Sequence, residues 1–163
     1  MARVHVSIGS NIDRERSVRQ GVAGLREAFG PLTLSPVYET AAVGFEGDDF
    51  YNLVAGFDTD LSPQQVAQRL RAIEDAAGRD RSQPRFSPRT LDLDLLLYDD
   101  AVLQADGVHI PRDEILKYAF VLKPLADIAG SLRHPECGET YAALWARFQG
   151  DRDLRPVALE LGD

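Results

Sequence analysis

Three things are scarce in this 163-residue chain: cysteine, long apolar runs and positive charge. A single cysteine, Cys137, leaves no pair for an internal disulfide or a thiolate metal site, which favours a reducing compartment such as the cytoplasm. We find no run of about 18 apolar residues to span a membrane, and the first residues lack the apolar segment of a signal peptide. We therefore expect neither membrane insertion nor export.

Basic residues are outnumbered: 18 Lys and Arg against 26 Asp and Glu give a net charge of −8. That balance argues against a broad basic face for nucleic acid. The positive charge is instead concentrated in the segment 79–89, which contains Arg79, Arg81, Arg85 and Arg89. Such a density suits one small polyanion, and a nucleoside triphosphate is the obvious candidate.

Several motifs are also absent. The sequence contains neither the G-x-x-x-x-G-K-[ST] loop nor the G-x-G-x-x-G fingerprint, which excludes the common glycine-rich phosphate loops. Three scattered histidines, His5, His109 and His134, give little support to a hydrolase triad. Phosphate groups must be held by other means.

Length and composition, with 44% apolar and 27% charged residues, predict one globular domain over residues 1–163. Periodicity predicts the order β-α-β-β-α-β, typical of a ferredoxin-like α+β fold, followed by a C-terminal helical extension. We expect strands at 4–8, 32–40, 50–58 and 91–98, helices at 14–29 and 63–77, and further helical segments at 115–119, 120–128 and 141–148. Asp13 is expected to cap the first helix, and Ser62 with Pro63 the second.

Two aspartates, Asp92 and Asp94, lie two positions apart in the last predicted strand. Residues i and i+2 of a strand point to the same face, so both carboxylates should project together while the intervening leucines enter a core. Oxygen ligands of this kind suit Mg²⁺, whose other positions go to water and substrate phosphates. The alternative is an ordinary half-exposed strand, which shows the same alternation.

The segment 85–96, RFSPRTLDLDLL, resembles the signature of 6-hydroxymethyl-7,8-dihydropterin pyrophosphokinases, enzymes of folate biosynthesis. Further segments resemble the family in the same order, and the similarity covers about residues 3 to 148. They are Ile8-Gly9-Ser10-Asn11, Val37-Tyr38-Glu39-Thr40, Phe50-Tyr51-Asn52, Ile73-Glu74, Gly78-Arg79 and Phe120-Val121-Leu122.

The resemblance implies transfer of a diphosphate from ATP to the hydroxymethyl group of the reduced pterin, giving AMP. It further implies that Asp92 and Asp94 bind two Mg²⁺ ions, and that Arg79 and Arg89 steady the transferring group. The residues that it places on the ATP side are Glu74, Arg81, Arg85 and Arg112.

Five residues correspond to the family's pterin pocket: Thr40, Val43, Asn52, Phe86 and Phe120. A flat heterocycle with a polar edge favours aromatic faces and an amide, which Asn52 can supply. The alternatives stay open here, because Phe120 can equally be a core residue and because Thr40 and Asn52 can serve local hydrogen bonding.

The sequence also departs from the family pattern on the nucleotide side. Arg112 stands where a histidine is common, and Tyr118 where an arginine is usual. We expect Arg112 to take over part of the missing arginine's phosphate contact, since it carries a permanent charge and five donors.

Two rival functions remain at this point. A noncatalytic or altered-specificity relative would keep the pterin and nucleotide pocket without the reaction, and a metal-dependent nuclease or nucleotidyltransferase would use the same two carboxylates. The aspartate pair and the arginine cluster favour the enzyme, and the net acidity counts against nucleic acid. We expect ATP and pterin as partners, and a monomer.

Overall fold

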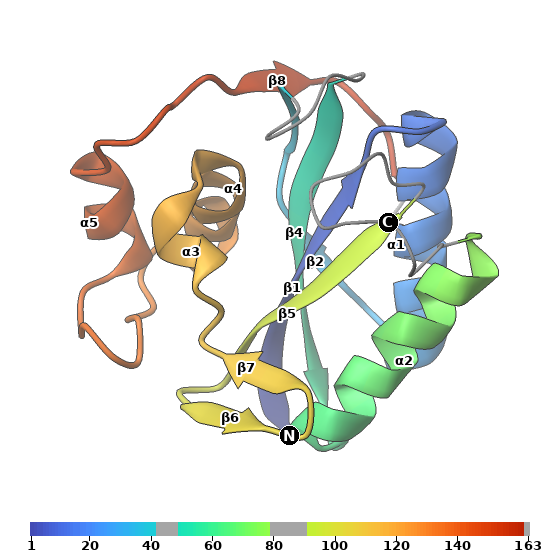
Figure 1. Cartoon of the computed structure of the whole chain (residues 1–163), viewed down its shortest axis with the longest axis horizontal. Coiled ribbons are helices and arrows are strands. Elements are labelled where there is room, and N and C mark those ends of the chain that lie inside the picture. The colour runs from blue at the N-terminus through green and yellow to red at the C-terminus, as the bar shows by residue number, and fades with distance from the viewer. Residues whose placement is uncertain (42–48, 79–90, 162–163) are drawn as a thin grey trace.

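The computed structural model describes residues 1–41, 49–78 and 91–161, which hold all of the secondary structure discussed below (Figure 1). The helices and strands follow in chain order: β1 (Ala2–Ser10), α1 (Arg14–Phe29), β2 (Thr33–Leu34), β3 (Val37–Thr40), β4 (Phe50–Thr59), α2 (Pro63–Ala76), β5 (Asp92–Tyr98), β6 (Leu103–Ala105), β7 (Val108–Ile110), α3 (Glu114–Lys117), α4 (Ala119–Ala129), α5 (Tyr141–Ala146) and β8 (Arg155–Val157).

The main sheet is antiparallel, with the strand order β5-β1-β4-β3-β8, and β2 pairs with β4 beside β3. The predicted strand 32–40 is therefore two strands, and its continuity was predicted wrongly. Ser35 and Pro36 separate them: Pro36 has no N–H for a ladder, and the Ser35 hydroxyl accepts from the backbone N–H of Val54 at 2.8 Å.

Helices cover both faces of this sheet (Figure 1). On one face, α1 and α2 enclose the larger core, which contains Leu53 of β4. On the other face, α3, α4 and α5 enclose a second core, which contains Val54. Because neighbouring residues of β4 enter different cores, this strand is buried on both sides.

A β-bulge in β5 changes which side chains reach each core. Val6 of β1 pairs with Leu95 and His5 pairs with Leu97, so Leu96 is the extra residue. Leu95 consequently packs in the α1/α2 core, whereas Leu96 and Leu97 both pack against the C-terminal helices. The bulge thereby attaches those helices to the strand that carries the aspartates.

The predicted helix starts have different outcomes. Ser62 caps α2 through a capping box with Gln65, and Pro63 occupies the first turn, as predicted. Asp13 makes no side-chain cap on α1, so that prediction is wrong. Its backbone is left-handed, at φ 50°, whereas a capping side chain needs an extended backbone at that position.

A hairpin that the sequence did not reveal joins β6 to β7. Its turn contains Asp106 and Gly107, at φ 53° and 78°, the Asp-Gly pair that favours tight hairpins. Among the described residues, no helix has both the length and the apolar character needed to cross a lipid bilayer.

We predict that His5 makes stability depend on pH. Burial in β1, aided by the charge of Arg3, lowers the pKa of its imidazole from 6.5 to about 4. Between these two values the imidazole is protonated in the unfolded chain but neutral in the folded chain. The free energy of unfolding therefore decreases as the pH falls from about 6.5 toward 4. In urea unfolding, the wild type should lose up to about 1.4 kcal/mol of unfolding free energy per pH unit in this range because of His5. The variant His5→Leu should not show this loss.

The matched control is His109→Leu, which changes a histidine of the β6–β7 hairpin and should retain the wild-type slope. Parallel stability curves for wild type and His5→Leu between about pH 6.5 and 4.5 would contradict the assignment.

Candidate active site

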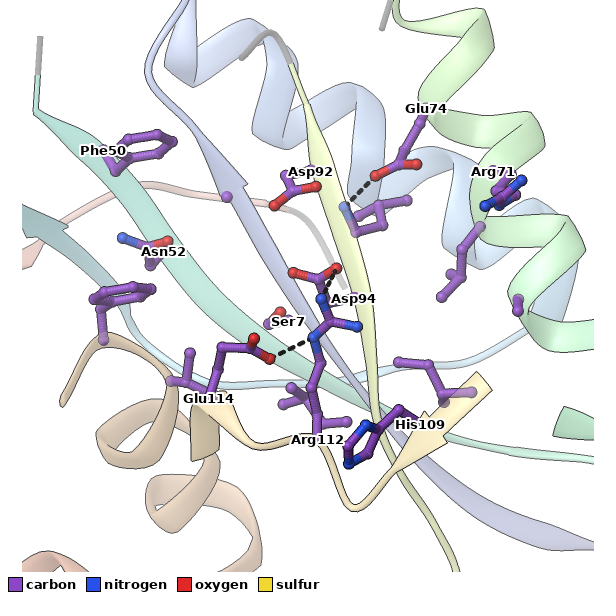
Figure 2. A pocket seen from close by; sticks show the side chains of 18 of the residues that line it. Ser7, Phe50, Asn52, Arg71, Glu74, Asp92, Asp94, His109, Arg112 and Glu114 are labelled. Atoms are coloured by element: carbon purple, nitrogen blue, oxygen red, sulfur yellow. Dashed lines mark hydrogen bonds and ion pairs between the residues drawn. The ribbon is translucent and has the colours of Figure 1, made fainter. Parts of the chain in front are cut away.

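A cavity of about 450 Å³ opens beside β5, between the sheet, α2 and the segment that leads into α4 (Figure 2). The predicted site residues that the structure describes all line it: Thr40, Asn52, Glu74, Asp92, Asp94, Arg112 and Phe120. The remaining predicted residues, Val43, Arg79, Arg81, Arg85, Phe86 and Arg89, lie outside the described residues.

Asp92 and Asp94 project from the same face of β5 into the cavity (Figure 2). They lie opposite Gly9 and Ser7 of β1 in the antiparallel ladder, while the intervening Leu93 packs in the α1/α2 core. The shared face follows the i, i+2 spacing, as predicted. The small partners on β1 leave open space in front of the carboxylates.

The environment of Asp94 disfavours its negative charge. Burial raises the pKa of this carboxyl to about 7, the charge of Asp92 acts in the same direction, and Arg112 opposes both. The side chain is nevertheless 28% exposed, so the carboxylate remains accessible from the cavity. A bound cation would relieve the repulsion, and the oxygen donors fit Mg²⁺.

Within the part of the chain that is described, no group of three His, Cys, Asp or Glu side chains forms a complete metal cage. Mg²⁺ commonly takes one or two protein carboxylates and fills its other positions with water and substrate oxygens.

Arg112 lies against these carboxylates. Its Nη2 is 3.3 Å from Asp94 Oδ1, and its Nε is 2.6 Å from Glu114 Oε2, an ion pair whose angles are not those of a hydrogen bond. Its backbone N–H donates to the carbonyl of Leu96 at 3.1 Å. The position that we assigned to the nucleotide side is therefore next to the candidate metal site.

Phe120, at the start of α4, is half-buried and faces the cavity while also packing against the second core. Tyr118 stacks on it, with ring centroids 4.9 Å apart and planes inclined by 20°. Tyr118 thus supports the aromatic wall of the cavity.

Asn52 forms a polar part of the cavity wall. Its Nδ2 donates to Thr40 Oγ1 at 2.8 Å, which fixes the amide from the neighbouring strand. Gly9 pairs with Asn52 across the ladder, and a Cβ at Gly9 would lie 2.9 Å from Asn52 Oδ1. The glycine is required by this close approach.

Glu74 is buried, with 4% of its surface exposed, and extends from α2 to β5. Its Oε2 accepts from the backbone N–H of Leu93 at 2.8 Å, between the two aspartates. This contact anchors the aspartate strand to α2, a function that the sequence did not indicate.

Other cavity residues were not predicted as site residues, among them Ser7, Phe50, Arg71, His109 and Glu114. For Ser7, the alternation of β1 was a usable signal, because Val6 and Ile8 enter the core and leave Ser7 on the other face. For His109 the Asp-Gly turn was a signal, since the hairpin brings that residue to the cavity.

We predict that Glu74→Ala destabilises the protein by about 1–3 kcal/mol, because it leaves the amide of Leu93 without its acceptor. Glu74→Gln retains an acceptor and is the matched control, with a smaller loss expected. Urea unfolding measures both. Equal losses for the two variants would show that the hydrogen bond to Leu93 is not the source of the effect.

The family of 7,8-dihydro-6-hydroxymethylpterin-pyrophosphokinase (HPPK) matches residues 5–130. The 2-amino-4-hydroxy-6-hydroxymethyldihydropteridine pyrophosphokinase of Pseudomonas aeruginosa is 38% identical over 138 residues, which are 82% of this chain and 85% of that protein. Its namesake in Aquifex aeolicus is 31% identical over 158 residues, 96% of each chain.

Longer proteins contain a similar region. The folic acid synthesis protein fol1 of Pneumocystis carinii is 32% identical over 94% of this chain, which spans 21% of fol1. A crystal structure of Plasmodium falciparum HPPK-DHPS wild type with pteroate has a TM-score of 0.72 over 90% of this chain and 42% of that one, and at 13% identity it shows the fold alone. Given the match to residues 5–130 and relatives of matching length, this chain belongs to the 6-hydroxymethyl-7,8-dihydropterin pyrophosphokinase family.

Proposed function

We propose that the cavity beside β5 is where this chain transfers diphosphate from ATP to 6-hydroxymethyl-7,8-dihydropterin in folate synthesis. The transfer is the activity of the family to which the chain belongs. The main observation behind this location is that one cavity is lined by the aspartate pair, by the amide of Asn52 and by the aromatic ring of Phe120.

In this proposal Asp92 and Asp94 hold two Mg²⁺ ions. Their shared face, the repulsion that raises the pKa of Asp94 and the oxygen donor set all support a cationic ligand there. Bound Mg²⁺ would neutralise phosphate oxygens and lower the pKa of the pterin hydroxyl. The chain's own contribution is to hold both carboxylates on a strand that Glu74 and the bulge fix from two sides.

The pterin is proposed to bind at the Phe120 end. Phe120, supported by Tyr118, offers a flat face, and Asn52 offers donor and acceptor groups to the polar edge of the ring. Thr40 orients that amide. Val43 and Phe86 are proposed to complete the pocket on the strength of the sequence resemblance.

The triphosphate is proposed to bind beside the aspartate pair, in the part of the cavity that Glu74 and Arg112 also line. Arg79, Arg81, Arg85 and Arg89 precede β5 in the chain, and their proposed contacts to ATP and to the transferring group rest on the resemblance. Transfer between bound substrates depends on positioning and charge neutralisation, which such a clamp supplies.

We further propose a single domain over residues 1–163, acting as a monomer in the cytoplasm with ATP and the reduced pterin as its partners. The order β5-β1-β4-β3, with α1 and α2 on one face, supports a ferredoxin-like core. The C-terminal helices would be an extension of it, packed on the opposite face.

The proposal is tested by direct detection of AMP and pterin diphosphate from ATP and the hydroxymethyl pterin. Binding of both ligands without AMP would favour the noncatalytic relative. Thermal stabilisation by an oligonucleotide, with none by the pterin, would favour the nuclease or nucleotidyltransferase alternative.

We predict that Asp92→Asn or Asp94→Asn lowers Mg-dependent AMP formation by several powers of ten, since each removes a charge from the proposed metal site. Circular dichroism should remain that of the wild type. The control is Asp58→Asn, which removes a carboxylate from the exposed end of β4 and should leave turnover unchanged. Activity within about tenfold of wild type for both aspartate variants would refute the metal assignment.

We also predict that Asn52→Ala raises the KM for the pterin about 10- to 100-fold while the KM for ATP changes little, because the lost groups face the pterin alone. Thr40→Val, which removes only the hydroxyl that orients the amide, should have a smaller effect in the same direction. Steady-state kinetics with each substrate varied separately measures this. Equal increases in both KM values would contradict the assignment of Asn52 to the pterin.

A further inference from the structure

We infer that Arg112 competes with the divalent cation for Asp94, so that the free protein binds the metal weakly until a nucleotide is present. This inference rests on the proposed metal function of the aspartate pair. It concerns Arg112, at which the sequence resemblance implies a departure from the family pattern.

The first support is geometric. Arg112 Nη2 is 3.3 Å from Asp94 Oδ1, so a guanidinium already occupies one side of the carboxylate that a cation would use. Figure 2 shows the guanidinium between Asp94 and Glu114, with contacts to both. Only a quarter of the Arg112 side chain is exposed, which reduces the screening of its charge by water.

The second support is that the backbone fixes this arrangement. The N–H of Arg112 donates to the carbonyl of Leu96, two residues after Asp94 on the same strand. The ion pair with Glu114 holds the Nε edge of the guanidinium. Because both of these contacts lie beside Asp94, they fix the guanidinium of Arg112 against this carboxylate. Arg112 is thus more restricted than an arginine that extends freely from the surface.

The third support is the local charge. Three other carboxylates, those of Asp92, Glu74 and Glu114, act on Asp94 in this part of the cavity, and the charge of Arg112 opposes them. A divalent cation that binds Asp94 must either displace the guanidinium or share the carboxylate with it, and sharing places two positive groups side by side. The free protein therefore loses metal affinity because of Arg112.

Nucleotide binding reverses this balance. The displaced guanidinium can donate to phosphate oxygens while its Nε edge stays with Glu114, so the triphosphate supplies the partner that Asp94 gives up. Metal and nucleotide then favour each other's binding, by the same factor in each direction. The chain would take the metal as its nucleotide complex in preference to the free ion.

The test is a Mn²⁺ titration of the nucleotide-free protein, followed by the electron paramagnetic resonance of unbound Mn²⁺. Arg112→Ala should tighten Mn²⁺ binding about tenfold, the change expected when one charge-assisted contact no longer competes. Arg112→Lys, which keeps the charge without the planar fork, should lie between wild type and Arg112→Ala. Circular dichroism and melting temperature establish that each variant is folded.

Two controls make the outcome specific. Arg147→Ala also removes one positive charge from an ion pair, with Glu139 near α5, and should leave Mn²⁺ affinity unchanged. In an Asp94→Asn background, Arg112→Ala should change the affinity less than about twofold, because the carboxylate for which it competes is gone. Equal Mn²⁺ affinity for wild type and Arg112→Ala, an equal gain from Arg147→Ala, or a gain that persists without Asp94 would overturn the inference.

The result is separable from the proposed function. Wild-type protein that forms AMP while Arg112→Ala gains no Mn²⁺ affinity would refute the competition alone. Wild-type protein that forms no AMP would refute the proposed reaction, while the Mn²⁺ titrations would still decide whether Arg112 and the cation share Asp94.

Discussion

Two carboxylates on one face of a strand repel each other, and the rest of this structure is arranged around that constraint. Asp92 and Asp94 cannot separate, because the pleat of β5 fixes them on the same side. Burial of Asp94, together with this repulsion, raises the pKa of its carboxyl to about 7. Such a site favours the binding of a positive charge. In the proposed function, the metal ion of a metal-triphosphate complex supplies that charge.

The two faces of the sheet contribute differently to holding the two carboxylates together. On the α1/α2 face, the carboxylate of Glu74 accepts a hydrogen bond from the backbone N–H of Leu93 and so fixes β5 to α2. On the opposite face, the segment from Arg112 to Phe120 supplies both a counter-charge for Asp94 and an aromatic wall. The bulge at Leu96 links the two faces, because it makes Leu96 and Leu97 of β5, which follow the aspartates, pack against the C-terminal helices.

Local rules predicted the features that depend on a single element. The i, i+2 spacing placed Asp92 and Asp94 together, and the Ser62-Pro63 start of α2 matched a known capping pattern. Features that depend on contacts between elements were missed. The bulge at Leu96 follows from pairing with β1, and the left-handed backbone of Asp13 follows from how the chain enters α1; neither has a periodic signature.

The same limit explains Arg112 and Tyr118. In the sequence they are two departures on the nucleotide side, and compensation for a lost phosphate contact is the simplest interpretation. In the structure their contacts are separate: Tyr118 stacks on Phe120, whereas Arg112 lies on Asp94 and Glu114. Tyr118 therefore packs behind the proposed pterin wall, whereas the charge of Arg112 opposes the negative charge of the proposed metal site. The sequence grouped both residues on the nucleotide side, whereas the packing of α3 and α4 against β5 determines which carboxylate or ring each of them contacts.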